Sequence, residues 1–328
     1  MNTNSWMIYG ANGYTGELIA REAVSRGLTP VLAGRSEDKI KPLAEELSLS
    51  YKIFSLTNTV ETEAALGDEY LVLHCAGPFS ATAEPMMRAC IHSSTHYLDI
   101  TGEISVYEMA KTLDDAAKNA GITLCPGVGF DVIPTDCVAA KLKQLMPDAD
   151  HLALGFDSSS VLSPGTAKTS IEGLSQGGKV RRDGNIIKVP LAFETRKIDF
   201  GDGEKLAMTI PWGDVSTAYF TTHIPNIEVF ISAPPKMIKK LKGLNKFRFL
   251  LGLKFVQNYL KKQVDKKVKG PDESKRNSLK TYVWGEARNK NGEIKTVKIK
   301  TANGYALTIT GSLAVVDYLI NHPESKGY

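Results

Sequence analysis

The chain has 328 residues, of which 42% are hydrophobic and 23% charged, the proportions of a folded globular protein rather than of a disordered chain. The length is sufficient for two domains. The formal net charge of +4 is too small to indicate a nucleic acid or membrane partner by itself. No apolar run approaches the roughly 20 residues that a membrane-spanning helix requires.

The cysteines and histidines predict neither a metal site nor a disulfide framework. The four cysteines form no C-x-x-C pair, and the six histidines show no ligand spacing such as H-x-x-x-H. The first residues contain no basic leader followed by a long apolar core, so we expect no signal peptide. We therefore expect reduced cysteines, no metal and a cytoplasmic location.

The first expected elements are a strand at 6–9, a glycine-containing turn at 10–16 and a helix that ends at Gly27. Glycines allow a tight turn and a close approach to a pyrophosphate, which the N-terminus of the helix can hold. The spacing G-x-x-G-x-x-G is a variant of the usual pattern, and the alternative is an ordinary flexible turn. The predicted cofactor contacts in this turn are Gly10, Asn12, Gly13, Tyr14, Thr15 and Gly16.

The second expected strand, 29–33, ends in Gly34, Arg35 and Ser36, which are also predicted cofactor contacts. A site for NAD usually has an acidic residue here, which binds the ribose 2′-hydroxyl. Arg35 is instead suited to a 2′-phosphate, because a guanidinium binds phosphate in a bidentate manner. The sequence therefore favours NADP over NAD. The alternative is that Arg35 is a solvated residue at the start of a helix.

Further strands are expected at 50–54, 70–75, 96–100 and 122–125, with helices between them. This alternation predicts a doubly wound, Rossmann-type parallel sheet. Loops after parallel strands line the ligand crevice, so segments 77–80, 101–103 and 127–131 are expected near the cofactor. Small residues after the fourth strand permit close contact with the nicotinamide end of the cofactor. The predicted contacts there are Ala76, Gly77, Pro78 and Phe79.

After about residue 148 the pattern changes to β-like segments separated by turns. Strands are expected at 152–157, 186–189, 205–210, 227–231, 280–287, 294–300 and 305–309, and the Asn291-Gly292 pair favours a hairpin turn. This predicts a second α+β domain with a mostly antiparallel sheet. The expected division is a Rossmann domain at 1–148, a substrate and dimerisation domain at 149–310, and a C-terminal helix at 311–328 that returns to the first domain.

Several of these motifs together resemble the saccharopine dehydrogenase-like oxidoreductases, in the branch that includes the trans-acting enoyl reductases. The motifs, in chain order, are G-A-N-G-Y-T-G at 10–16, A-G-R at 33–35, C-A-G-P-F at 75–79, Y-L-D-I-T-G-E at 97–103, P-G-V-G-F-D-V-I-P at 126–134, S-P-G-T-A-K-T-S at 163–170 and G-Y-A-L at 304–307. The resemblance implies a nicotinamide cofactor, an inserted domain that often dimerises and a returning C-terminal helix. It does not indicate a substrate.

Two carboxylates are candidates for a general acid or a substrate anchor: Glu103 after the fifth strand, and Asp131 in the loop after the sixth. A carboxyl group in a dry crevice can act as an acid near neutral pH. The alternative for Asp131 is that it only supports the start of a helix. His74 is expected in the core. Tyr107 and Lys111 match the Y-x-x-x-K spacing of short-chain dehydrogenases, which we interpret as coincidence.

The strongest change in composition is at 236–269, where eleven lysines and one arginine face one aspartate, a net charge of +11. Apolar residues crowd together at 247–256. A basic segment with an apolar patch is typical of a membrane-surface element, and it would also suit a lid over an apolar substrate. The alternative is a pair of solvated helices that pack on the domain or on a dimer partner. Nucleic acid is not expected as a partner.

The leading hypothesis is an NADP-dependent oxidoreductase that transfers hydride to or from a carbonyl, imine or activated alkene, with a small-molecule or lipid-like substrate and a homodimeric assembly. The rival is a catalytically silent NADP-binding module that 236–269 tethers to a membrane surface or a partner protein. A third possibility is an imine reductase of amino-acid metabolism, which predicts a carboxylate-binding arginine among Arg181, Arg182 and Arg196.

Overall fold

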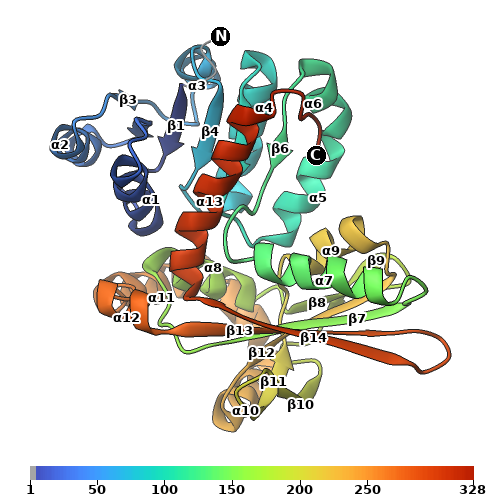
Figure 1. Ribbon diagram of the computed structural model, residues 1–328. Coiled ribbons are helices and arrows are strands. Elements are labelled where there is room, and N and C mark those ends of the chain that lie inside the picture. Colours follow the sequence, from blue (N-terminus) through green and yellow to red (C-terminus); the bar gives the residue numbers. More distant parts are fainter. Residues whose placement is uncertain (1–4) are drawn as a thin grey trace. The chain divides into compact units, whose positions relative to one another are not determined.

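The structure, a computed structural model, describes residues 5–328 except for the side chains of Asp265 and Asn277, and it divides into two compact units (Figure 1). The first unit is Met1–Phe130 with Leu307–Tyr328, and the second is Asp131–Ala306. The first unit therefore ends earlier than the expected boundary after residue 148. The reason is helix α7 (Ile133–Leu145), which packs on the second sheet: a Cβ at Gly285 would lie 2.5 Å from Val138 Cγ1.

A six-stranded parallel sheet forms the centre of the first unit, with the strand order β3-β2-β1-β4-β5-β6. This confirms the predicted doubly wound sheet, because the order reverses between β1 and β4. The central strands are apolar and buried, as is typical of a sheet covered by helices on both faces. The strands are β1 (Trp6–Tyr9), β2 (Val31–Gly34), β3 (Tyr51–Ile53), β4 (Leu71–His74), β5 (His96–Asp99) and β6 (Leu124–Cys125).

Two buried apolar clusters flank this sheet because successive strand residues point to opposite faces. Ile8 and Leu73 belong to one cluster, and Met7 and Val72 belong to the other. The connecting helices are α1 (Tyr14–Ser25), α2 (Glu37–Leu47), α3 (Thr59–Leu66), α4 (Phe79–Ser93), α5 (Ile104–Thr112) and α6 (Asp114–Ala120).

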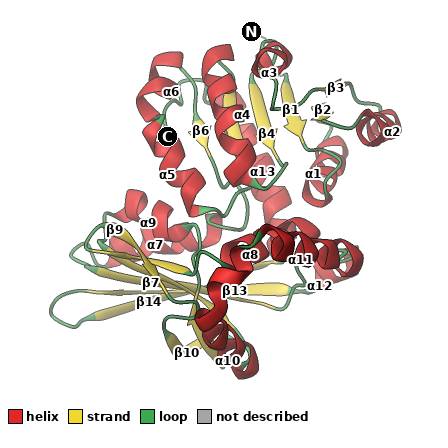
Figure 2. Cartoon of the chain, turned by 180° about the vertical axis from the view of Figure 1, so that it is seen from behind, coloured by secondary structure: helices red, strands yellow, loops and turns green. Residues whose placement is uncertain are grey.

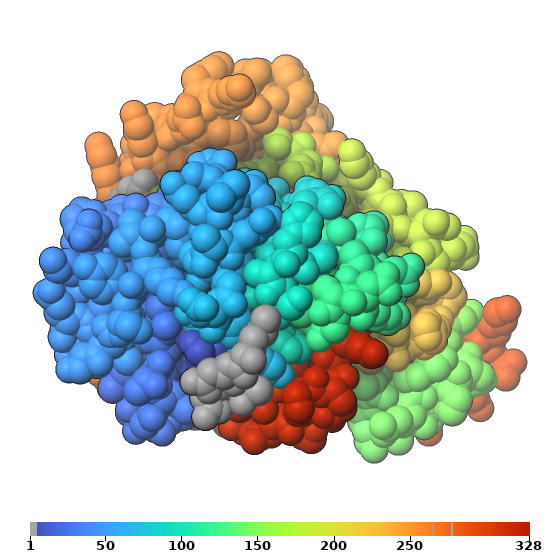
Figure 3. Space-filling view, turned by 90° about the horizontal axis from the view of Figure 1, so that it is seen from above, coloured from blue at the N-terminus to red at the C-terminus, as the bar shows by residue number. Residues whose placement is uncertain are grey.

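The C-terminal helix, α13 (Gly304–Asn321), packs on the core of the first unit. Leu313, Val316 and Leu319 are buried in the same cluster as Ile8, and the Tyr70 hydroxyl donates to the Leu319 carbonyl at 2.9 Å. In the space-filling view, the red C-terminal segment lies beside blue and cyan residues of this unit (Figure 3).

The expected strand at 305–309 is wrong, because α13 already begins at Gly304. Asn303 precedes the helix, and its side-chain oxygen accepts a hydrogen bond from the Tyr305 N–H at 3.0 Å. This is the usual role of an asparagine at a helix N-terminus. This cap and the burial of the helix override the β-like pattern of Tyr305, Thr308 and Ile309.

The second unit is built on an eight-stranded mixed sheet with the path β10-β11-β12-β7-β13-β14, to which β8 and β9 are added through β12. Only the β12–β7 pair is parallel, so the expected mostly antiparallel sheet is confirmed. The strands are β7 (His151–Ser158), β8 (Gly178–Arg182), β9 (Asn185–Val189), β10 (Thr195–Asp199), β11 (Glu204–Thr209), β12 (Asn226–Ser232), β13 (Lys280–Arg288) and β14 (Ile294–Ala302).

The remaining helices of the second unit include two that we did not expect, α8 (Pro164–Leu174) and α9 (Asp214–Thr222). Ser163 caps α8, because its hydroxyl accepts from the Thr166 N–H at 3.2 Å. The basic segment forms α10 (Pro235–Leu244), a 3₁₀ helix η1 (Asn245–Gly252) and α11 (Lys254–Lys267), and α12 (Glu273–Ser278) follows. Figure 2 shows α8, α10 and α11 in front of the second sheet.

Candidate cofactor site

The glycine turn after β1 is tightly folded, and its glycines are required by sterics. Gly10 has a φ of +82°, and a Cβ there would lie 2.7 Å from the Ala76 Cβ. A Cβ at Gly16 would lie 2.4 Å from the Gly10 carbonyl oxygen, and one at Gly13 would lie 3.2 Å from the same oxygen. The turn is held by hydrogen bonds from the Gly10 N–H to Ala33 and from the Gly13 N–H to Gly10. Side chains at these three glycine positions would require the neighbouring atoms of the turn to move.

Helix α1 begins directly after this turn without a side-chain cap. Gly13 occupies the N-cap position and makes no side-chain hydrogen bond, and the first helical bond runs from the Glu17 N–H to the Gly13 carbonyl at 2.9 Å. The N–H groups of the first turn of a helix point along its axis and carry the positive end of its dipole. This end of α1 is therefore suited to an anionic group such as a pyrophosphate.

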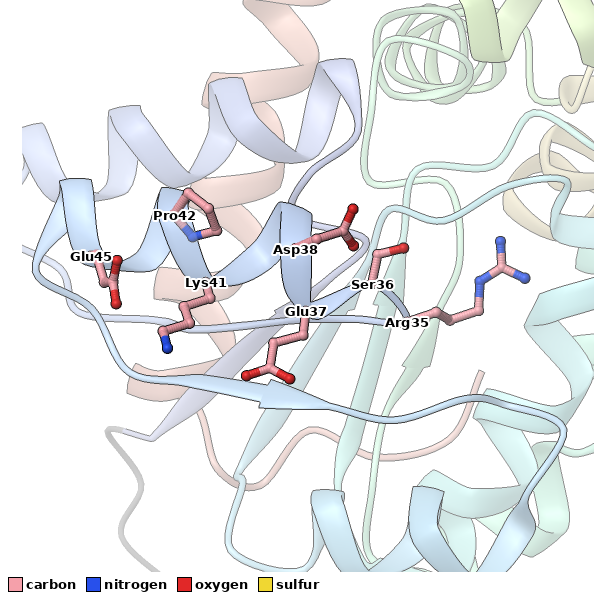
Figure 4. Close-up of a pocket in the computed structure, with 7 residues that line it drawn as sticks. All are labelled: Arg35, Ser36, Glu37, Asp38, Lys41, Pro42 and Glu45. Carbon is pink, nitrogen blue, oxygen red and sulfur yellow. The ribbon is translucent and has the colours of Figure 1, made fainter.

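The end of β2 carries Arg35 and Ser36, which line a shallow surface depression with five residues of α2 (Figure 4). The Arg35 side chain is exposed and points away from Lys41 and Glu45. Gly34 lies close to the glycine turn, because a Cβ there would be 3.3 Å from the Asn12 Oδ1. Three acids, Glu37, Asp38 and Glu45, also line the depression, and the first two lie in the first turn of α2.

The loop after β4 contacts the glycine turn on one side and Glu103 on the other. Ala76 lies against Gly10, as described above. Helix α4 begins at Phe79, and the two carboxylate oxygens of Glu103 accept hydrogen bonds from the Phe79 and Ser80 N–H groups, both at 2.9 Å. Glu103 thus supplies the negative charge at the N-terminus of α4. The structure brings Glu103 together with this predicted cofactor loop.

Asp99, at the end of β5, connects three loops of the first unit. Its carboxylate accepts from the Tyr97 hydroxyl at 2.6 Å, from the Thr101 N–H at 2.9 Å and from the Gly127 N–H at 2.7 Å. Complete burial raises the pKa of Asp99 to about 6, although these hydrogen bonds act in the opposite direction. Because Asp99 is inaccessible, we assign it a positioning role rather than contact with a substrate.

Asp131 belongs to the second unit, just before α7, so the structure does not group it with the loops described above. Two other acids of this unit, Asp136 on α7 and Asp214 on α9, interact electrostatically with it or with each other. Burial raises the pKa of Asp214 well above its ordinary value, and the charges of Asp136 and then Asp131 raise it further. Burial also raises the pKa of Asp136, whose carboxylate accepts from the Thr221 hydroxyl at 2.7 Å. We did not single out Asp136 or Asp214 from the sequence, which offers no local signal for them.

Three further side chains of the first unit, His74, His96 and Tyr107, have internal contacts. His74 is fully buried, which lowers its pKa to about 3, and its Nε2 lies 3.0 Å from the Thr82 hydroxyl. His96 is buried and accepts from the Thr123 N–H at 3.0 Å. The hydroxyl of Tyr107 is buried and donates to the Thr101 carbonyl at 2.6 Å.

The three arginines of the second unit that were considered for carboxylate binding are also engaged. Arg181 is buried and donates to the Val215 and Gly184 carbonyls. Arg182 pairs with Glu228. Arg196 forms a bidentate pair with Glu286, at 2.9 and 3.2 Å. These contacts do not favour the imine reductase hypothesis.

The cysteines, histidines and acids of the described residues do not form a metal site. The four cysteines form no disulfide, and three of them lie inside the first unit while Cys137 is exposed on α7. Within residues 5–328, leaving aside the two undescribed side chains, no group of three or more histidines, cysteines or acids is arranged to hold a metal ion.

Comparison with known proteins identifies the first unit. Residues 6–125 match the family model of the saccharopine dehydrogenase NADP-binding domain. The first unit thus resembles the NADP-binding domain of the saccharopine dehydrogenase family, and the curated relatives are saccharopine dehydrogenase-like oxidoreductases and trans-acting enoyl reductases. A mouse saccharopine dehydrogenase-like oxidoreductase is 29% identical over 203 residues, which cover 54% of this chain and 47% of the relative. A trans-acting enoyl reductase of Mycobacterium tuberculosis is 31% identical over 140 residues, 40% of this chain and 33% of the relative.

The similarity also extends to the fold of the whole chain. The structure of apo saccharopine dehydrogenase (L-Glu forming) from Saccharomyces cerevisiae matches with a TM-score of 0.64 and 10% identity, covering 97% of this chain and 91% of that one. At this identity the match supports the fold alone. The aligned regions of the two relatives named above span half or less of their length. The matched family model and the relatives confirm the resemblance inferred from the motifs.

The residues present fit a nicotinamide dinucleotide. Only glycine at positions 10 and 16 leaves the space in which the turn closes. Gly13 leaves the N–H groups at the start of α1 without a side-chain cap, so they are available to a pyrophosphate. When bound, the cofactor supplies the hydride-transfer chemistry of the family, while the protein supplies binding and orientation. The turn and the start of α1 would hold the pyrophosphate, and the end of β2 would hold the adenosine ribose.

Proposed function

We propose that this protein is an NADP-dependent oxidoreductase that transfers hydride to or from a carbonyl, imine or activated alkene. The observation that supports NADP over NAD is Arg35. It follows β2 at the position where NAD-binding proteins usually place a carboxylate, and its exposed side chain points away from the acid of α2 at Glu45. A 2′-phosphate would accept hydrogen bonds from this guanidinium and from the Ser36 hydroxyl.

In this proposal, side chains of the protein position the cofactor loops and supply a proton to the substrate. Glu103 fixes the start of α4, so it holds the segment 76–79 that contacts the cofactor. Asp99 holds the loops at Thr101 and Gly127. Asp131 is the candidate for the general acid or substrate anchor, and Glu103 is the second candidate. Both oxygens of Glu103 already accept hydrogen bonds, which suits an orienting role better than proton donation.

We infer that the substrate is apolar or lipid-like. The basic segment 236–269 presents apolar side chains to solvent, and one relative carries the name of an enoyl reductase. A homodimer, which the resemblance implies, is part of this proposal. The rival function is an NADP-binding module without turnover. It would be favoured if Glu103 and Asp131 had only structural roles.

The experiment that tests the proposal is a paired titration with NADPH and NADH. Wild-type protein is expected to bind NADPH at least about tenfold more tightly, a difference of roughly 1.4 kcal/mol. Arg35→Ala is expected to remove most of this difference by weakening NADPH alone, because NADH has no 2′-phosphate. Lys41→Ala is the matched control, since Lys41 lines the same depression but points away from Arg35. Equal binding of both nucleotides by wild-type protein would refute the assignment.

A further inference from the structure

The basic segment exposes aromatic rings that a folded protein usually buries. Phe247 is 60% exposed, Phe249 and Phe255 are each 71% exposed, and Tyr259 is 62% exposed. These four residues lie on η1 and the first part of α11, within thirteen residues of one another. Large exposed apolar patches mark interaction sites. In the space-filling view, side chains of the orange segment stand out from the surface (Figure 3).

The exposed rings belong to a segment that is attached to the second unit at several points. The Asn245 side chain accepts from the Leu191 N–H at 2.8 Å and donates to the Leu191 carbonyl at 3.1 Å. The Gln257 amide donates to the Ile171 carbonyl at 3.2 Å, and Lys261 pairs with Glu172. Val264 is buried. The segment therefore has an inner face that packs and an outer face that keeps its aromatic rings in solvent.

Exposed positive charge flanks the aromatic residues along the chain. The segment 236–269 carries a net charge of +11, although the whole chain carries only +4, so the remaining residues are net negative. Ten of its lysines are exposed: 236, 239, 240, 242, 246, 254, 262, 266, 267 and 269. They occur on α10, η1 and α11, with Lys269 just after α11, so they lie before, between and after the aromatic residues in the chain. Any surface that covers the rings must also accept this charge.

An anionic lipid bilayer meets both requirements. Its headgroups attract lysine, and its acyl region receives phenyl rings that insert about 5–10 Å below the surface. A nucleic acid would supply the charge but no apolar phase. A second copy, meeting this face with the same face, would bring an identical net charge of +11 against it. We propose that the outer face of 236–269, here called the basic aromatic face, binds anionic membrane surfaces.

Among the residues that the structure describes, no helix is long and apolar enough to cross a bilayer. The proposed contact is with the surface of the membrane. Tyr259 fits this depth, because tyrosine combines an apolar ring with a polar hydroxyl and is enriched at membrane interfaces. Basic residues beside the rings then remain at the level of the headgroups. The proposal does not require oxidoreductase activity, although the substrate class inferred above draws on the same exposed apolar side chains.

The test is co-sedimentation of the full chain with vesicles of phosphatidylcholine that contain about 30% phosphatidylglycerol, compared with phosphatidylcholine alone. Wild-type protein is expected to bind the anionic vesicles at least about tenfold more strongly, and to lose most of this binding when salt rises from about 0.1 M to about 0.5 M. The variant F247S/F249S/F255S is expected to lose at least about tenfold in partitioning, since each ring contributes apolar burial. K239Q/K240Q/K246Q/K254Q is expected to lose a similar factor.

Two control variants separate this face from general effects of exposure and charge. Val60→Ser removes an apolar side chain that is 76% exposed on α3, and K290Q/K295Q removes two exposed lysines of the β13–β14 hairpin. Both are expected to bind vesicles within about twofold of wild type. Thermal unfolding checks that each variant is folded, and the salt and headgroup dependence of the wild type tests the proposal even if the triple serine variant unfolds.

Three outcomes would overturn the proposal. The first is equal binding to neutral and anionic vesicles, and the second is unchanged binding of the serine variant. The third is a wild-type dimer in sedimentation velocity that F247S/F249S/F255S converts to monomer while vesicle binding is absent. In that case a second copy covers the rings.

Discussion

Gly16→Ala is the sharpest test of the glycine turn, because its consequence is fixed by backbone atoms. The new Cβ would lie 2.4 Å from the Gly10 carbonyl oxygen and 3.0 Å from the Ala11 Cα. Neither neighbour is the movable end of a side chain, so the turn or the start of α1 must shift. The same shift would displace the N–H groups that are proposed to hold the pyrophosphate.

The expected magnitude follows from known costs of overpacking. Inserting a methyl group into a closely packed position destabilises a protein by about 1–3 kcal/mol. For a unit of this size, each kcal/mol lowers the melting temperature by roughly 2–4 °C. Alanine has a higher helix propensity than glycine, which offsets up to about 1 kcal/mol. We therefore expect a lower melting temperature together with at least about tenfold weaker NADPH binding.

Gly67→Ala provides the matched control in the same unit. Its Cβ would meet nothing closer than 3.6 Å, and its φ of −57° is open to any residue. This substitution is expected to leave NADPH binding unchanged. It should raise stability slightly, because alanine reduces the conformational entropy of the unfolded chain. Differential scanning fluorimetry and nucleotide titration would be run on all three proteins. If Gly16→Ala behaves like Gly67→Ala in both assays, the steric argument is refuted.

Two further predictions concern the acids. Asp99→Asn changes the pH dependence of stability: because the folded pKa of about 6 exceeds the ordinary 3.8, the wild type loses stability as pH rises from about 4 to 6. The melting temperature of the variant should therefore rise relative to that of the wild type between about pH 4 and 6, and the difference between the two should be constant above about pH 7. A difference that does not depend on pH would contradict this prediction. Glu103→Gln with Asp131→Asn should abolish turnover in an enzyme, and NADPH binding should weaken as well because Glu103 holds the start of α4. Activity assays that find unchanged turnover would remove both residues from the chemistry.

The features that could be predicted from the sequence are those that depend on residues close together in the chain. The turn at 10–16 was predictable because its glycines are required by local geometry. A Cβ at Gly16 would meet the carbonyl oxygen of Gly10, only six residues away, and Gly10 itself adopts a positive φ. The parallel sheet was predictable from buried apolar strands that alternate with helices. The strand expected at 305–309 failed because a cap at Asn303 and burial against the first unit decide its conformation.

Features of the site that depend on distant residues were decided by tertiary structure only. Glu103 reaches the start of α4 from 23 and 24 residues away, and Asp99 reaches Gly127 from 28 residues away. No local pattern specifies such pairs, because hydrogen-bond partners are selected by how strands and loops come together. The composition of 236–269 likewise predicted an apolar, basic segment, but only the packed structure determined that Phe249 and Phe255 face solvent while Val264 faces the protein. Composition fixes the chemistry a segment carries, and packing decides which part of it remains available.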